Sequence, residues 1–282
     1  MTTTLDHGEI TVADGTTIGY RRLGTGPGLV LVHGSMSSGH NHLELATALA
    51  DRFTVYLPDR RGRGISGPYH PEDGLTTEVD DLALLLAHTG SQRVFGVSSG
   101  GIIALEAARR GGIERVAVFE PPLFPDPTGP AAFLADLERH LAAGDLAAAL
   151  VCGMKGAQMG PALLRKLPDR LLAKLTGAAM RSEKPSGYVS MRALAPTLRH
   201  EFRIVVAASG PTDRYAGIGS NALLMGGSKS PTYLKDALTR LQASIPGAGR
   251  VELPGLDHGA SWNTDRRGRP GPVADELRRF FA

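Results

Sequence analysis

The serine at position 98 lies in a pattern that can make it a nucleophile. Residues 96–100 read Gly-Val-Ser-Ser-Gly and fit G-x-S-x-G, in which the serine stands on a sharp turn between a strand and a helix. The apolar run 93–97 favours a strand before this turn, and the pattern of 101–112 favours a helix after it. Free N–H groups at the start of such a helix can stabilise an oxyanion. A tight turn without chemistry would show the same pattern, so Ser98 needs partners.

A serine hydroxyl is a weak nucleophile until a base accepts its proton. His258 lies just past the last expected strand, in LPGLDHGASW (253–262). Loops at the carboxyl ends of parallel strands converge on one edge of the sheet, so we expect His258 to approach Ser98. A plain surface histidine is the alternative. His33, at the end of the strand 29–34, is a rival base, but we expect its imidazole to hold the loop conformation and prefer His258.

Two backbone amides are candidates for holding the oxyanion. One is the N–H of Ser99, which follows the nucleophile, and the other comes from the loop after the strand 29–34. Ser35 is the expected contributor from that loop, with Met36 as its neighbour. Met36 and Trp262 lie near these residues in the sequence, and we consider them for the wall of an acyl pocket, although core packing would account for them equally well.

The expected elements would gather these residues at one edge of a sheet. Two strands flank the turn dipeptide Asp14-Gly15, and strands then alternate with helices along the chain. The expected strands lie at 29–34, 53–58, 93–97, 115–120, 221–227 and 249–255, and the expected helices at 41–52, 79–90, 101–112, 233–246 and 272–282. This alternation predicts an α/β fold, with a mostly parallel central sheet and helices on both of its faces.

The alternation breaks between residues 123 and 215. This region contains helical stretches at 130–150, 161–177 and 189–202 but no convincing buried strand. A chain of 282 residues is consistent with one domain that carries an insertion. We therefore expect an α/β core formed by residues 1–122 and 216–282, interrupted by a helical insertion at 123–215.

Four segments, taken in their order and spacing, resemble the α/β-hydrolase superfamily. They are LVLVHGS (29–35), PDRRGRGIS (58–66), GVSSGG (96–101) and LPGLDH (253–258). The similarity extends from about residue 8 to the C-terminal helix. It implies an α/β-hydrolase fold in which the insertion is a helical cap, with the chain order nucleophile, acid, histidine. It thereby implies Ser98 as the nucleophile and His258 as the base.

The same resemblance places a catalytic Asp or Glu just after the strand 221–227, where this chain has none. The loop there reads Ser-Lys-Ser-Pro, with Lys229 near the expected position. A lysine cannot accept the Nδ1–H of a histidine, and its positive charge would oppose formation of the imidazolium. The chain therefore departs from the family pattern at the acid.

Three substitutes for the acid remain open. Glu120 ends the strand 115–120, a location from which some family members supply the acid, and it is the leading candidate. Its alternative role is a structural carboxylate bonded to backbone N–H groups. Asp257 adjoins His258 in the chain and ranks lower, because chain neighbours rarely face each other. The last option is a dyad of Ser98 and His258 with no acid.

Composition argues against several other classes of protein. The net charge is +3, the arginines are dispersed and aromatic residues make up 5%, so we expect no nucleic-acid partner. No stretch approaches the roughly 20 apolar residues of a membrane span, and residues 1–10 show no secretory signal. With Cys152 as the one cysteine, we expect a cytoplasmic protein without membrane association.

No cofactor or metal is expected. His33, His40 and His42 lie close together in the sequence, but no carboxylate or cysteine completes a metal-binding set. The chain has no P-loop and no dinucleotide-binding pattern. Residues 59–64 (DRRGRG) could suggest phosphate binding, but we expect them to form a structural loop of the fold.

The expected function is hydrolysis of a small-molecule ester, lactone or thioester through an acyl-enzyme on Ser98. The departure at the acid keeps two alternatives open. One is a non-hydrolytic enzyme on the same scaffold, such as a lyase, a cyclase or an acyltransferase of secondary metabolism. The other is a catalytically inactive member that binds a ligand. The expected partner is a small-molecule substrate, and the sequence leaves open whether the chain forms a homodimer.

Overall fold

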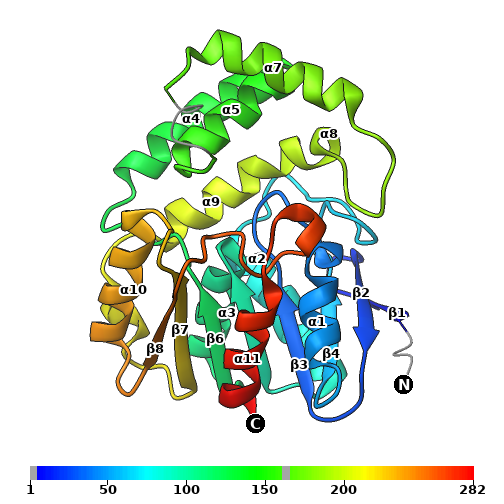
Figure 1. Ribbon diagram of the computed structural model, residues 1–282, viewed down its shortest axis with the longest axis vertical. Helices are drawn as coiled ribbons and strands as arrows, with labels where there is room; N and C mark the ends of the chain where they lie inside the picture. The colour runs from blue at the N-terminus through cyan, green and yellow to red at the C-terminus, as the bar shows by residue number, and fades with distance from the viewer. Residues whose placement is uncertain (1–4, 161–165) are drawn as a thin grey trace.

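An eight-stranded sheet organises the computed structural model, which describes residues 5–160 and 166–282 (Figure 1). The strand order is β1-β2-β4-β3-β5-β6-β7-β8. β2 pairs antiparallel with β1 and with β4, and the remaining pairs are parallel. The strands are β1 (Asp6–Thr11), β2 (Thr17–Leu23), β3 (Gly28–Val32), β4 (Thr54–Pro58), β5 (Arg93–Val97), β6 (Arg115–Phe119), β7 (Asn221–Gly227) and β8 (Gly249–Leu253). The predicted α/β fold with a mostly parallel sheet is confirmed.

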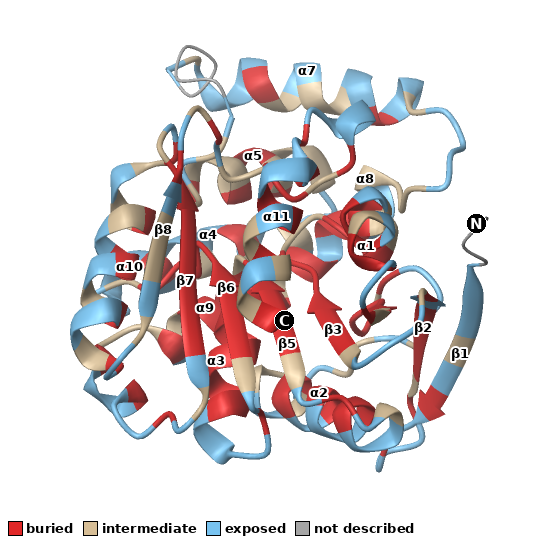
Figure 2. Cartoon of the chain, turned by 60° about the horizontal axis from the view of Figure 1, so that its bottom comes forward, coloured by how far each residue is buried: buried red, intermediate tan, exposed pale blue. Residues whose placement is uncertain are grey.

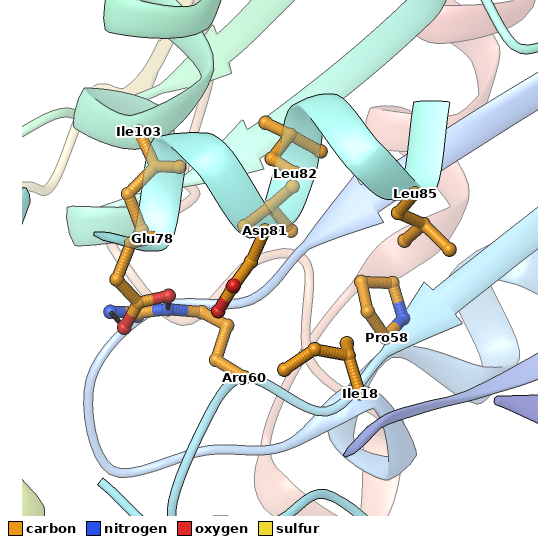
Figure 3. Close-up of a pocket in the computed structure, with 9 residues that line it drawn as sticks. Ile18, Pro58, Arg60, Glu78, Asp81, Leu82, Leu85 and Ile103 are labelled. Carbon is orange, nitrogen blue, oxygen red and sulfur yellow. Dashed lines mark hydrogen bonds and ion pairs between the residues drawn. The ribbon is translucent and has the colours of Figure 1, made fainter. Parts of the chain in front are cut away.

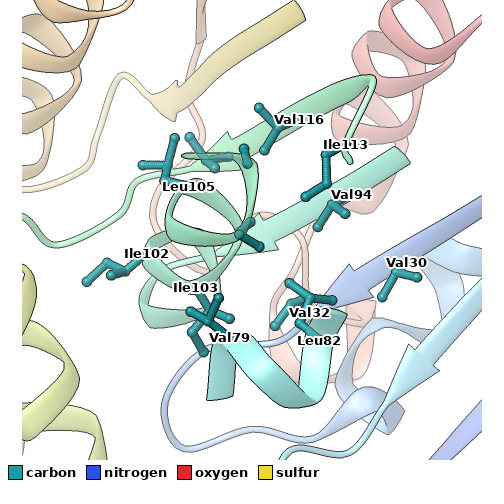
Figure 4. Close-up of a cluster of buried hydrophobic side chains, with 14 of the residues drawn as sticks. Val30, Val32, Val79, Leu82, Val94, Ile102, Ile103, Leu105, Ile113 and Val116 are labelled. Atoms are coloured by element: carbon teal, nitrogen blue, oxygen red, sulfur yellow. The ribbon is translucent and has the colours of Figure 1, made fainter. Parts of the chain in front are cut away.

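Helices cover both faces of the sheet, which explains why its central strands are continuous aliphatic runs. One face packs against α2 (Leu75–Thr89), α3 (Ser99–Arg110) and α10 (Thr232–Ser244), and the other against α1 (Leu43–Leu49) and α11 (Pro270–Phe281). Figure 2 shows the central strands of the sheet as mostly buried, while the outer sides of the helices are exposed. Figure 4 shows valines of β3, β5 and β6 facing apolar side chains of α2 and α3.

A run of helices separates β6 from β7 in the sequence. These helices are α4 (Thr128–Ala142), α5 (Leu146–Gly156), α7 (Asp169–Ser182), α8 (Met191–Leu194) and α9 (Leu198–Ala208). In Figure 1 they lie across one end of the sheet, with α9 between the outer helices and the strands. Within the described residues no strand occurs here, and the first part of the helical stretch predicted at 161–177 lies outside those residues. The division into core and cap stays a prediction.

Short 3-10 turns complete the chain. They span Gly39–His42, Ala195–Thr197, Thr212–Tyr215 and Thr264–Arg266. None of the helices in the described part of the chain is both long enough and apolar enough to cross a membrane.

Candidate active site

Ser98 stands on a strained turn between β5 and α3. Its φ and ψ angles are 56° and −124°, a conformation that non-glycine residues seldom adopt. Its N–H donates to the carbonyl of Phe119 at 2.9 Å, which anchors the turn to β6. A Cβ at Gly96 would lie 2.3 Å from the Gly100 oxygen, and one at Gly100 would lie 2.3 Å from the oxygen of Val32. The glycines thus allow the strand and the helix to meet this closely, as G-x-S-x-G requires.

His258 is paired with a buried carboxylate. Nδ1 of His258 lies 2.7 Å from Oε2 of Glu120, whose side chain is 0% exposed, compared with 13% for the histidine. Glu120 directly follows β6 and has a φ of 52°. Its other oxygen, Oε1, accepts the N–H of Gly227 at 2.6 Å. The carboxylate is therefore fixed at both oxygens, and it can orient the imidazole with the Nδ1 proton toward Glu120.

Neither Asp257, the other acid candidate, nor Lys229, which stands where an acid was expected, lies in such a position. Asp257 is exposed, and its Oδ1 accepts the N–H of Gly259 at 3.0 Å. Lys229 is also exposed, and its backbone N–H donates to the Leu256 carbonyl at 2.8 Å. On β7, a Cβ at Gly226 would lie 3.0 Å from Oε1 of Glu120. The absence of a side chain at Gly226 thus leaves room for the Glu120 carboxylate, which extends from the end of the neighbouring strand β6.

His33, the rival base, is buried and has a hydrogen-bond partner at each of its two ring nitrogens. Nδ1 lies 2.8 Å from the Gly34 carbonyl oxygen, and Nε2 accepts the N–H of Arg60 at 3.0 Å. Burial lowers the pKa of His33 well below its ordinary value, so the imidazole is neutral. This ring joins the loop after β3 to the loop after β4, which is the loop-holding position expected for it.

The amides expected to hold an oxyanion lie beside Ser98. Ser99 is the first residue of α3, so its N–H has no acceptor within the helix. The loop after β3 approaches closely, because a Cβ at Gly34 would lie 2.8 Å from Cβ of Ser98. In the described part of the chain, no backbone hydrogen bond uses the N–H of Ser35 or Met36. These amides are available to a ligand.

One cavity of about 390 Å³ collects the predicted side chains. Ser98 and His258 both border it, and so do four other predicted residues: Ser35, Met36, Ser99 and Trp262. Glu120 lies behind His258 and does not border the cavity. The remaining wall is mostly apolar and comes largely from the helices between β6 and β7, through Leu150, Val151, Met154, Thr176, Met191, Leu198, Phe202 and Val205, together with Phe124, Met159 and Tyr233.

Sequence reasoning missed Glu201, a carboxylate in the wall of this cavity. Glu201 lies on α9 and is 2% exposed. Its Oε1 accepts from Nη1 of Arg60 at 3.1 Å and also from Nη2 of Arg63. The residues between Arg60 and Glu201 number about half of the chain, so no local spacing could have revealed the pair. The only signal was the three arginines of the DRRGRG loop, which would need buried partners.

Arg60 links this carboxylate to the rest of the site. Its guanidinium also bonds Glu78 on α2, at 2.7 and 3.0 Å, and Figure 3 shows the two side chains together below that helix. Nη1 of Arg60 further reaches Oγ of Ser99 at 3.2 Å and the carbonyl of His33 at 3.3 Å. The DRRGRG loop thus uses its arginines in internal ion pairs, which agrees with a structural loop.

The described residues offer no evident metal site. Among residues 5–160 and 166–282, no group of three or more His, Cys, Asp or Glu side chains is arranged to hold a metal ion. Cys152 on α5 is a free, half-buried thiol whose pKa is raised by burial, and a raised pKa opposes reactivity as a thiolate.

Comparison with known proteins places this chain in a family. The sequence model of the alpha/beta hydrolase family matches residues 29–276. The crystal structure of an alpha/beta hydrolase from Sphaerobacter thermophilus is 33% identical, covers 98% of this chain and 100% of that one, and superposes with a TM-score of 0.78. A thermophilic esterase from Thermogutta terrifontis shares the fold at 20% identity and a TM-score of 0.74, with 98% of this chain and 100% of that chain covered.

A curated relative matches over a shorter stretch. The uncharacterized hydrolase YraK of Bacillus subtilis is 35% identical over 111 residues, which are 38% of this chain and 41% of YraK. The chain therefore matches less than half of that relative's length. The family model, by contrast, extends from β3 to the C-terminal helix. With this match and its eight-stranded sheet, the chain belongs to the alpha/beta hydrolase family.

Proposed function

We propose that this chain hydrolyses a small-molecule ester, lactone or thioester through an acyl-enzyme formed on Ser98. Family membership assigns hydrolase chemistry in general terms. The observation that carries the finer proposal is the 2.7 Å contact between His258 Nδ1 and the buried carboxylate of Glu120. The absence of an acid after β7 left a non-hydrolytic enzyme and an inactive protein open as alternatives to the hydrolase, and the contact of Glu120 with His258 supports the hydrolase.

In the proposed reaction, Glu120 keeps the proton of His258 on Nδ1, which leaves Nε2 free to act as a base. Ser98 Oγ attacks the substrate carbonyl carbon while Nε2 takes the hydroxyl proton, and the imidazolium forms against the Glu120 carboxylate. The N–H groups of Ser99 and Ser35 donate to the oxyanion of the tetrahedral intermediate. Collapse of that intermediate breaks the bond to the leaving alcohol or thiol, which receives the proton from His258.

Deacylation repeats these steps with water. His258 takes a proton from a water molecule, the resulting oxygen attacks the acyl carbon, and Ser98 Oγ leaves with the proton returned by His258. The carboxylic acid product departs, and both residues regain their starting states.

We further propose that residues 123–215 act as a cap over a core of residues 1–122 and 216–282. The cavity supports this division because its wall takes residues from both parts.

Replacing Ser98 tests the mechanism. We expect Ser98→Ala to lower kcat for p-nitrophenyl hexanoate by about a thousandfold or more, because the nucleophile is lost. A fluorophosphonate probe should label the wild-type protein at Ser98, as located by mass spectrometry of the peptides. Ser220→Ala is a matched control, since Ser220 bonds the Ile113 carbonyl and does not border the cavity. Unchanged turnover in folded Ser98→Ala protein would contradict the acyl-enzyme.

A further inference from the structure

We infer that the cavity takes an uncharged, largely apolar acyl compound, and that it discriminates against substrates carrying a carboxylate or an ammonium group. The inference rests on the proposed function for the reaction itself and adds the class of substrate. It comes from the charges that border the cavity and from the partners that those charges already have.

The size and the apolar wall of the cavity support the first part of the inference, that the substrate is largely apolar. Its volume is about 390 Å³, and since a water molecule occupies about 30 Å³ in the liquid, the cavity has room for on the order of a dozen non-hydrogen atoms. Side chains such as Met154, Leu198, Phe202 and Trp262 form most of its wall. Such a wall binds hydrocarbon by removing it from water.

Among the described residues, this wall offers no cation to a carboxylate substrate. Within residues 5–160 and 166–282, the side chains that border the cavity include no lysine and no arginine. The imidazole of His258 already faces Glu120. The hydroxyl of Tyr233 is uncharged and already donates to the Ala157 carbonyl at 3.0 Å. A substrate carboxylate would therefore lose its hydration without gaining an ionic partner, and that loss is costly.

Glu201, the carboxylate that the described residues place in the wall, is equally unavailable to a cationic substrate. Both oxygens of Glu201 accept from Arg60, at 3.1 and 3.4 Å, and Oε1 also accepts from Arg63. Arg60 is in turn bound to Glu78. The two arginines and the two glutamates form a set without net charge, and all four side chains are at most 3% exposed. A further charge of either sign would be buried beside this balanced set without a partner.

Three esters of matched length test the inference. They are p-nitrophenyl hexanoate, the mono-p-nitrophenyl ester of adipic acid, and p-nitrophenyl 6-aminohexanoate, which share a six-carbon acyl chain and differ at its end. We expect kcat/KM for the hexanoate to exceed that for each charged ester by about tenfold or more, since each tenfold corresponds to only about 1.4 kcal/mol. Equal or better turnover of either charged ester would overturn the inference.

The Ser98→Ala variant separates this outcome from failure of the proposed function. If the adipate ester is preferred and its turnover still requires Ser98, the inference about charge fails while the serine mechanism stands. If turnover of all three esters persists in Ser98→Ala, the mechanism itself fails.

A charge placed in the wall provides a second test. Thr176 on α7 borders the cavity and is half-buried, so Thr176→Lys adds a cation there and Thr176→Met is a neutral control of similar length. We expect Thr176→Lys to raise the ratio of kcat/KM for the adipate ester over the hexanoate by about tenfold, and Thr176→Met to leave it unchanged. An unchanged ratio in folded Thr176→Lys protein would count against the inference.

Removing the carboxylate of Glu201 should also favour the adipate ester over the hexanoate. Glu201→Gln leaves Arg60 and Arg63 with Glu78 alone, which makes the wall positive, and should also raise the adipate-to-hexanoate ratio. Asp81→Asn is the control, because Asp81 pairs with Arg61 of the same loop and does not border the cavity. A similar rise in Asp81→Asn would contradict the argument. Thermal unfolding monitors the fold of both variants, and the Thr176 pair decides the question if Glu201→Gln does not fold.

Discussion

At the scale of single residues, the proposed role of Glu120 rests on the order of the strands, because β7 is followed by no carboxylate that could serve as the acid. β6 and β7 are neighbours in the sheet, so their carboxyl ends lie side by side at the edge where the His258 loop returns. A carboxylate at the end of β6 therefore reaches His258 from the adjacent strand. In the proposed mechanism the loop after β7 supplies no catalytic group, and its Lys229 side chain is exposed.

Changing the Glu120 carboxylate to an amide should disable the base. In Glu120→Gln the amide NH₂ can face Nδ1 of His258 and donate to it, which moves the imidazole proton to Nε2, where it blocks removal of the Ser98 proton. We expect kcat for p-nitrophenyl hexanoate to fall by about ten-thousandfold, a loss of the size seen when a triad acid is neutralised.

Two variants serve as controls for this prediction. Asp257→Asn and Lys229→Ala alter exposed side chains next to the site, and we expect each to retain kcat within about threefold, because both side chains are exposed and the Asp257 carboxylate bonds the Gly259 N–H. A loss in Asp257→Asn as large as that in Glu120→Gln would reassign the acid to Asp257.

At the scale of elements, the DRRGRG loop joins parts of the fold that are distant in the sequence. Through Arg60 it binds α2 at Glu78 and α9 at Glu201, and through Arg61 it binds α2 again at Asp81. Each ion pair is buried, so each charge depends on its partner. The loop thereby fixes α9, which forms part of the cavity wall, to the sheet that carries Ser98.

Removing the Arg60 guanidinium should destabilise the protein strongly. Arg60→Ala leaves Glu78 and Glu201 buried with fewer partners, and the loss of one partner from a buried ion pair costs about 3–5 kcal/mol. Urea unfolding followed by circular dichroism measures the change in free energy. Arg22→Ala is the control, because the pair of Arg22 with Asp6 is about half exposed and we expect little change there. An Arg60→Ala protein as stable as the wild type would show that this network contributes little.

The elements also show how far local sequence patterns can predict this molecule. The strand expected at 93–97 coincides with β5, because a buried strand needs only a short aliphatic run and a turn after it. The helix expected at 79–90 begins earlier, at Leu75, and Oγ1 of Thr77 in its first turn accepts the N–H of Gly74 at 3.4 Å. The placement of α9 over the sheet and the pairing of Glu201 depend on contacts between distant segments. Such contacts leave no periodicity in the sequence, so the pairing was not predicted.

At the scale of the whole molecule, buried histidines make stability depend on pH. His42 precedes α1 and its Nδ1 lies 3.0 Å from the carbonyl of Ser261, which ties the first third of the chain to the loop that carries His258. Nε2 of His42 is buried and has no hydrogen-bond partner among the described residues. Burial lowers the pKa of His42 to about 4, and it also lowers that of His33. Both rings must therefore stay neutral in the folded protein.

Acidification should consequently destabilise the fold. The pKa of His42 is lower in the folded than in the unfolded chain, where it is about 6.5, so below that pH the unfolded chain binds a proton that the folded chain does not. The stabilisation is present above pH 6.5 and is lost as the pH falls toward 4, and for His42 it amounts to about 3 kcal/mol. Urea unfolding of the wild type at pH 7.5 and pH 5 should show the decrease.

His42→Asn is the control for this prediction. It keeps a donor for the Ser261 carbonyl but cannot titrate, so its free energy of unfolding should fall by about 2 kcal/mol less than that of the wild type between these pH values. Because the comparison is made within each protein, any constant cost of the substitution cancels, and equal decreases in the two proteins would show that His42 is not the titrating group.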